Sequence, residues 1–142
     1  MSNLYNKQVI NTEKRYQSPL PYSQAIRTGT TIYLSGITGQ DPNTGNIVNG
    51  GFEAEARQVF INMGSVLKAA GGCTYSNVVK NTVLLADIND FALLNKIYAD
   101  YFKEDPPART TYQVVNLPRG ARIEIESVAV CDINDEKTTS QL

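Results

Sequence analysis

The stretch PARTTYQVVNLPRGARIEIESVAV, residues 107–130, decides how this chain is expected to fold. Two segments of alternating side-chain character, Thr110–Val115 and Arg122–Val130, flank the sequence Leu117-Pro118-Arg119-Gly120. Alternation is typical of strands, and a short linker with proline and glycine is typical of a turn. The stretch therefore predicts a β-hairpin.

One face of this predicted hairpin is polar. If the turn is centred within residues 117–120, antiparallel pairing sets Thr111 near Glu126 and Arg109 near Val128. The polar residues that then share one face are Arg109, Thr111, Glu124 and Glu126. The aliphatic residues that would meet the helices lie on the other face. A shift of one residue in register would reverse the two faces. The polar face is either solvated or covered by another copy of the chain.

Two amphipathic helices are predicted upstream of the hairpin. Apolar residues recur at helical spacing through Phe52–Ala70, where Gly71-Gly72 ends the pattern, and again through residues 90–103. Shorter runs typical of strands are Gln8–Asn11, Tyr22–Arg27, Thr31–Ser35 and Val78–Ile88. The economical packing is an α+β fold, in which a mixed sheet carries both helices on one face.

The composition predicts one soluble domain over residues 1–131, followed by a polar tail at 132–142. The 142 residues are 42% hydrophobic, and 13 basic against 14 acidic side chains give a net charge of −1, so nucleic acid is not an expected partner. No apolar run is long enough for a membrane span and no targeting segment is evident, so we expect a cytoplasmic location. We interpret the likeness of Ser140-Gln141-Leu142 to a peroxisomal signal as chance.

The chain has no histidine, which excludes Ser-His-Asp and Cys-His catalysis and any histidine base. Its two cysteines, Cys73 and Cys131, lack neighbouring ligands at metal-binding spacing, so no metal site is predicted. We interpret them as two free thiols, with a single disulfide as the alternative.

Several short motifs carry a family resemblance by their order and spacing. In the first half they are Pro21-Tyr22-Ser23-Gln24-Ala25, Ser35-Gly36, Gly39-Gln40 and Ala69-Ala70-Gly71-Gly72. In the second half they are Val79-Lys80-Asn81-Thr82-Val83, Asp90-Phe91 with Asn95, Pro107-Ala108-Arg109, Leu117-Pro118-Arg119-Gly120 and Ile123-Glu124-Ile125-Glu126. From about residue 7 to 130 the chain resembles the RidA branch of the Rid family, the reactive-intermediate imine deaminases also called YjgF-like or L-PSP proteins.

This resemblance implies a chorismate-mutase-like fold of the bacillary type, assembled as a homotrimer with active sites between subunits. It also implies hydrolysis of 2-imino acids, such as 2-iminobutanoate and 2-iminopropanoate, to 2-keto acids and ammonia without a cofactor. Two other functions stay open. One is an endoribonuclease or translation inhibitor, which the net charge and the lack of a basic stripe disfavour. The other is a non-catalytic, chaperone-like or ligand-sensing trimer.

Three residues match the family's catalytic positions. Arg109 would hold the substrate carboxylate with its planar fork of donors. Glu124 would orient the attacking water and carry a proton, and Tyr22 would line the cleft. The alternatives are a structural ion pair for Arg109, an ordinary sheet-face carboxylate for Glu124 and a packing role for Tyr22.

Four further residues match substrate-binding positions. Gly36 would let the backbone approach the ligand closely, because it has no side chain. Asn95 and Phe91 would form part of the pocket wall. Thr111 departs from the family pattern, since some members have cysteine there, but its hydroxyl could still form a hydrogen bond.

Overall fold

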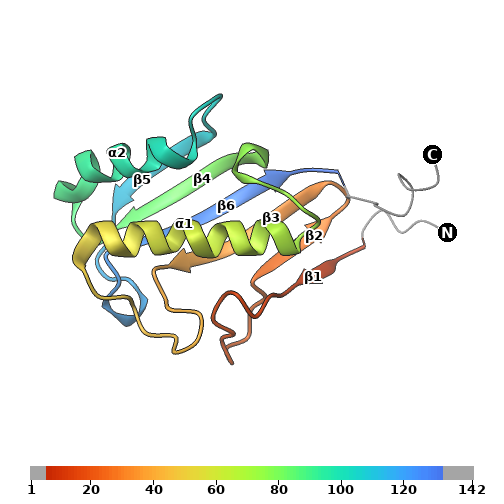
Figure 1. Cartoon of the computed structure of the whole chain (residues 1–142), viewed down its shortest axis with the longest axis horizontal. Helices are drawn as coiled ribbons and strands as arrows, with labels where there is room; N and C mark the ends of the chain where they lie inside the picture. The colour runs from red at the N-terminus through yellow and green to blue at the C-terminus, as the bar shows by residue number, and fades with distance from the viewer. Residues whose placement is uncertain (1–5, 133–142) are drawn as a thin grey trace.

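The computed structural model describes residues 6–132, in which two helices cover one face of a six-stranded mixed sheet (Figure 1). The strands are β1 (Gln8–Ile10), β2 (Ala25–Thr28), β3 (Thr31–Thr38), β4 (Val78–Leu85), β5 (Ala108–Gln113) and β6 (Ile123–Val130). The helices are α1 (Gly51–Ala69) and α2 (Phe91–Tyr101), with short 3-10 turns at Tyr75–Asn77, Ile88–Asp90 and Pro118–Gly120. The predicted α+β class, with both helices on one face, is confirmed.

The hydrophobic core lies between the sheet and the helices. Phe60, Met63 and Leu67 of α1 are fully buried in it, together with Ile125 of β6 and Ile37 of β3. Each such side chain contributes roughly 1.5–3 kcal/mol through the removal of its apolar surface from water. The helical spacing of apolar residues in Phe52–Ala70 therefore did identify the buried face of α1.

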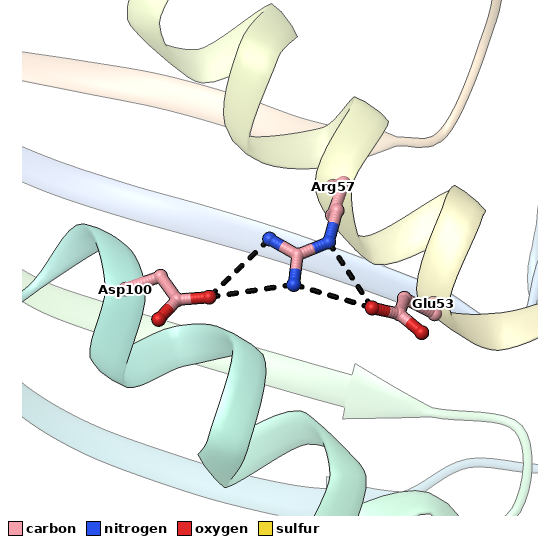
Figure 2. A network of polar contacts seen from close by, with 3 residues as sticks. All are labelled: Glu53, Arg57 and Asp100. Atoms are coloured by element: carbon pink, nitrogen blue, oxygen red, sulfur yellow. Dashed lines mark hydrogen bonds and ion pairs between the residues drawn. The ribbon is translucent and has the colours of Figure 1, made fainter.

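The two helices also contact one another directly. At the surface, the guanidinium of Arg57 lies 3.2 Å from Glu53 of its own helix and 3.3 Å from Asp100 of α2 (Figure 2). These groups are well exposed, so the network contributes little stability. Below it, the rings of Phe60 and Tyr101 stack with their centroids 4.3 Å apart. Aromatic packing rather than the ion pairs therefore holds α2 against α1.

The predicted hairpin is wrong, because β5 and β6 do not pair. The strand order is β1-β2-β3-β6-β4-β5, so that β4 lies between them, antiparallel to β6 and parallel to β5. The alternate residues of β4 are buried, which suits a central strand, whereas most side chains of β5 are exposed, which suits an edge. The turn at Pro118–Gly120 belongs to a longer connection that passes from the sheet edge back to β6.

The insertion of β4 also overturns the predicted polar face. Arg109 lies beside Asn81 in the register of β4 and β5, and Asn81 is buried against α2. Arg109 and Thr111 are therefore on the face that the helices cover. Glu124 and Glu126 alternate with the buried residues of β6 and lie on the uncovered face. The four residues do not share a face.

The prediction of two free thiols is wrong as well, because Cys73 and Cys131 form a disulfide. Their Cα atoms lie 6.1 Å apart, although the residues are separated by 58 positions in the sequence. Cys73 follows α1 and Cys131 follows β6, and α1 packs across the sheet close to β6 (Figure 1). Sequence spacing does not reveal such a meeting of distant segments.

No helix within residues 6–132 is long and apolar enough to cross a membrane. The tail predicted for residues 132–142, which includes Ser140-Gln141-Leu142, lies outside the described residues except for Asp132. The division into a domain at 1–131 and a tail therefore stays a prediction.

Candidate functional site

A cavity of about 280 Å³ opens at the end of the sheet where Thr38 of β3 pairs with Glu124 of β6. It is lined by Tyr22 from the segment before β2, by Gly36 of β3 and by Glu124. Three predicted site residues are thus brought together. The other lining residues include Tyr16, Leu20, Gln40, Pro118 and Arg119.

Gly36 gives the Glu124 carboxylate its place in this cavity. The register of β3 and β6 shifts between Leu34 and Ile37, so Gly36 lies in an irregular part of β3. A Cβ atom on Gly36 would overlap Oε1 of Glu124. The glycine therefore makes room for a carboxylate of its own chain, and its predicted approach to a ligand stays a prediction.

The surroundings of Glu124 favour its neutral form. Burial raises the pKa of this half-buried carboxyl, and the like charge of Glu126 raises it further, while the cation of Arg15 opposes both effects. A carboxyl group with a raised pKa takes up and returns a proton more readily near neutral pH. Glu124 is thus suited to proton transfer at the cavity wall.

Arg15 is a site residue that the sequence analysis missed. Its side chain is only 4% exposed, and it donates from Nη2 to the Gly36 carbonyl at 2.8 Å and from Nη1 to the Gln24 carbonyl at 3.3 Å. Burial lowers the pKa of its guanidinium, but electrostatic interactions with Tyr22 and Glu124 act in the opposite direction. A single arginine in a polar, aperiodic segment carries no pattern that predicts this position.

A second group of predicted residues surrounds Arg109, away from the cavity. The Arg109 Nη2 donates to Oδ1 of Asn95 at 2.7 Å, and the guanidinium lies over the rings of Phe91 at 5.6 Å and Tyr98 at 4.7 Å. Within residues 6–132 it forms no ion pair, in contrast to the structural alternative. Arg109 is therefore a cation held on an aromatic platform, with donors free for an anion.

The platform is itself tied to the core. The Asn81 amide of β4 donates to the Tyr98 hydroxyl at 2.8 Å and accepts a hydrogen bond from Ser127 of β6. All three side chains are buried, so these contacts fix the tyrosine ring beneath the guanidinium of Arg109. Tyr98 and Asn81 were not among the predicted site residues, because Tyr98 lies in the predicted helix at 90–103 and Asn81 in a predicted strand.

Thr111 lies two residues beyond Arg109 on β5. Its hydroxyl is buried and has no hydrogen-bond partner within the described part of the chain. A buried hydroxyl without a partner is costly, and such groups commonly pair with a ligand, a water or another chain.

A single chain does not bring Arg109 to Glu124. Glu124 of β6 and Tyr112 of β5 both pair with the same residue of β4, which lies between them. Arg109 lies three residues before Tyr112 on β5. With standard strand spacings, the two Cα atoms are about 14 Å apart, and the side chains are on opposite faces. The Arg109 guanidinium and the Glu124 carboxyl thus lie at two separate places in the chain.

No group of three potential ligand side chains within residues 6–132 is arranged to hold a metal ion. What the two places offer chemically is a carboxylate clamp at Arg109 and acid–base chemistry at Glu124.

Comparisons with known proteins agree along nearly the whole chain. A family model described as Endoribonuclease L-PSP matches residues 12–131. The 2-iminobutanoate/2-iminopropanoate deaminase of Homo sapiens is 55% identical over 130 residues, which cover 92% of this chain and 93% of the human protein. The crystal structure of RidA from the Antarctic bacterium Psychrobacter sp. PAMC 21119 is similar with a TM-score of 0.83 at 43% identity, over 87% of this chain and 99% of that chain. The structure of E. coli TdcF with bound serine is similar with a TM-score of 0.81 at 32% identity, over 88% and 99% of the two chains.

Proposed function

The chain belongs to the Endoribonuclease L-PSP family, in its RidA branch, and from this premise we propose that it hydrolyses 2-iminobutanoate and 2-iminopropanoate to 2-keto acids and ammonia. The observation that carries the proposal is the identity of 52–55% to the human and bovine deaminases over most of the chain. The separate Arg109 and Glu124 groups supply the chemistry that this reaction requires.

Arg109 is the residue proposed to hold the substrate. A 2-imino acid carries a carboxylate next to its C=N bond, and a guanidinium binds a carboxylate with two parallel hydrogen bonds. Asn95 occupies one donor of Arg109, and the aromatic rings fix the plane of the guanidinium. The remaining donors are thereby oriented before the substrate arrives, which reduces the cost of binding.

Glu124 is proposed to move protons during the reaction. The oxygen of a water adds to the carbon of the protonated imine as Glu124 accepts one of the water's protons, which gives a neutral tetrahedral carbinolamine. Glu124 then returns this proton to the nitrogen and takes the hydroxyl proton as the C–N bond breaks, so the products are ammonia and the keto acid. Tyr22 lines the same cavity and is proposed to hydrogen-bond the water or the substrate.

The proposed assembly is a homotrimer of chorismate-mutase-like subunits, with each active site shared by two chains. Two observations support it. Glu124 and Arg109 lie on opposite faces of the sheet, so a second copy is needed to bring them together. The uncovered face also exposes Tyr33, Tyr112 and Val130, which are 52%, 48% and 42% exposed, and a large exposed apolar surface favours association.

We do not propose that the chain is an endoribonuclease or a translation inhibitor, although its family is named Endoribonuclease L-PSP. A net charge of −1 gives no general attraction for a polyanion. A chaperone-like or ligand-sensing role has no observation of its own here. The cytoplasm is the proposed location.

A coupled assay tests the proposed function directly. A threonine dehydratase generates 2-iminobutanoate, and the disappearance of the imine is followed with and without this protein. We expect faster loss of the imine and matching release of ammonia. No acceleration by a folded, oligomeric preparation would overturn the proposal.

The pH dependence should respond to Glu126. Because the charge of Glu126 raises the pKa of Glu124, the Glu126→Gln variant should lower that pKa. The base form of Glu124 then persists to lower pH, so the acid limb of the kcat/KM profile should move to lower pH while the neutral plateau is unchanged. The exposed Glu104→Gln variant serves as control and should keep the native profile. An acid limb that stayed in place, or moved upward, would contradict this account of Glu124.

The aromatic platform should affect binding more than turnover. Tyr98→Leu removes a ring beneath Arg109, and a partly desolvated cation–π contact of about 1–2 kcal/mol corresponds to a rise in KM of roughly 5-fold to 30-fold. Tyr98→Phe keeps the ring, so KM should stay within about twofold, but it leaves the buried Asn81 amide unpaired and should lower stability by about 1–3 kcal/mol. Steady-state kinetics and thermal unfolding of the two variants separate these effects. Equal KM values in both would show that the ring does not position Arg109.

A further inference from the structure

A buried arginine lies at the end of β6 opposite to the cavity. Arg27 of β2 is 2% exposed, and its Nε and Nη1 donate to the carbonyl oxygens of Ala70, Gly29 and Cys131 at 2.9–3.0 Å. Its Nη2 faces two sulfur atoms, Sγ of Cys131 at 3.3 Å and Sγ of Cys73 at 3.7 Å. All of these acceptors are neutral when the cysteines are joined.

A guanidinium stays protonated even when it is buried, so Arg27 carries a positive charge in a place where charge is costly. Within residues 6–132 no carboxylate forms an ion pair with it. Among the groups that Arg27 contacts, the two sulfur atoms can become anionic, because a reduced cysteine ionises to a thiolate. A neighbouring arginine favours that ionisation and activates the sulfur as a nucleophile.

The two cysteines lie close enough for their disulfide to form and break. Their Cα distance of 6.1 Å falls within the range that disulfides need, so the bond closes without movement of the backbone. Cys73 is only 4% exposed, whereas Cys131 is partly exposed and lies closer to Arg27. Cys131 is therefore the sulfur that an oxidant in solution reaches first, and Cys73 is the sulfur that resolves the product. The carboxylate of Asp132, next in the chain, is exposed and so largely screened by water.

We propose that Cys131, Cys73 and Arg27 form a redox-active modification site that a hydroperoxide oxidises. The Cys131 thiolate attacks one oxygen of the O–O bond, which gives a sulfenic acid and, after uptake of a proton, an alcohol or water. The Cys73 sulfur then attacks the sulfenic sulfur, the S–S bond forms, and the hydroxyl leaves as water with the thiol proton of Cys73. Two thiols and one hydroperoxide thus become one disulfide, one alcohol or water and one further water, and a dithiol reductant reverses the change.

This site is separate from the proposed imine chemistry. Cys131 lies seven residues after Glu124 along β6, which corresponds to about 23 Å. The proposal therefore does not depend on the deaminase function, and closing the disulfide should leave imine hydrolysis unchanged. Closing the disulfide should instead raise the thermal unfolding temperature, because it links the segment after α1 to the end of β6.

The first test measures the reactivity of Cys131 alone. In the reduced Cys73→Ser variant, the rate of alkylation by iodoacetamide is followed against pH by intact mass. We expect a midpoint below about pH 7 instead of the ordinary value of about 8.5, and a return to about 8.5 or above in the Cys73→Ser, Arg27→Met double variant. If the double variant does not fold, the midpoint in the variant that keeps Arg27 decides alone. An ordinary midpoint in that variant overturns the proposal.

The second test follows the oxidation itself. The reduced native chain is treated with equimolar hydrogen peroxide at pH 7, and the loss of two alkylatable thiols is timed against glutathione. We expect closure about tenfold faster than the oxidation of glutathione, because more of Cys131 is ionised. In the Cys73→Ser variant a sulfenic acid on Cys131 should be trapped by dimedone, whereas Cys131→Ser should trap none. Oxidation at the rate of glutathione, or a sulfenic acid on Cys73 instead, contradicts the proposed site.

Discussion

Replacing Arg109 with alanine is expected to lower kcat/KM for 2-iminobutanoate about 10³-fold. The variant loses two charge-assisted hydrogen bonds to the substrate carboxylate, at roughly 1.5–3 kcal/mol each. Steady-state kinetics with imine supplied by a threonine dehydratase measures the change. Because Arg109 lies on β5 at the sheet edge and makes no ion pair within residues 6–132, the substitution should leave the fold intact.

Two further variants make this result specific. Arg57→Ala removes an exposed arginine of α1 that pairs with surface carboxylates and does not line the cavity, and it should keep native kinetics. Arg109→Lys keeps the positive charge but loses the planar fork, so it should recover only part of the activity. If Arg109→Ala retained native kcat/KM, the substrate carboxylate would be bound elsewhere, and Arg119, which lines the cavity, would become the candidate.

The sequence predicted the elements of this fold better than their pairing. Phe52–Ala70 was recognised because helical spacing is a local signal. The strand within Val78–Ile88 was recognised because it is rich in aliphatic residues, although it ends at Leu85. Which strand lies beside β6 depends on contacts between distant residues, and local alternation does not encode it. Because β4 lies between β5 and β6, Arg109 and Thr111 are on the helix-covered face and not on the face of Glu124.

In the candidate site, too, local sequence motifs identified residues, whereas contacts between distant residues could not be predicted. Arg109, Glu124 and Tyr22 were selected through family motifs, and the structure then divided them between two places in the chain. Arg15 carries no motif, and Tyr98 has the spacing of an ordinary core residue, so neither was identified. Their roles follow only from their contacts, which are the Gly36 carbonyl for Arg15 and the Arg109 guanidinium for Tyr98.

The Glu124→Gln variant should lower kcat by about 10²–10⁴ with little change in KM. The amide has the shape of the carboxylate but cannot accept the proton of the attacking water, and general base catalysis contributes a factor of this size. Glu124 is half-buried against Gly36, and glutamine fits the same space. Glu104→Gln is the matched control, because it changes an exposed carboxylate outside the cavity. A kcat within threefold of native would remove Glu124 from the chemistry.

Mixing the two inactive variants would show whether one active site is built from two chains. If Arg109 of one subunit acts with Glu124 of its neighbour, a trimer that contains both Arg109→Ala and Glu124→Gln subunits regains sites in which both residues are native. Random assembly from equal amounts makes about one quarter of the sites native, so activity should rise to about a quarter of the native value. If each chain held a complete site, every site would lack one residue and the mixture would stay inactive after unfolding and reassembly together. The fold favours recovery, because Arg109 and Glu124 of one chain lie on opposite faces of the sheet.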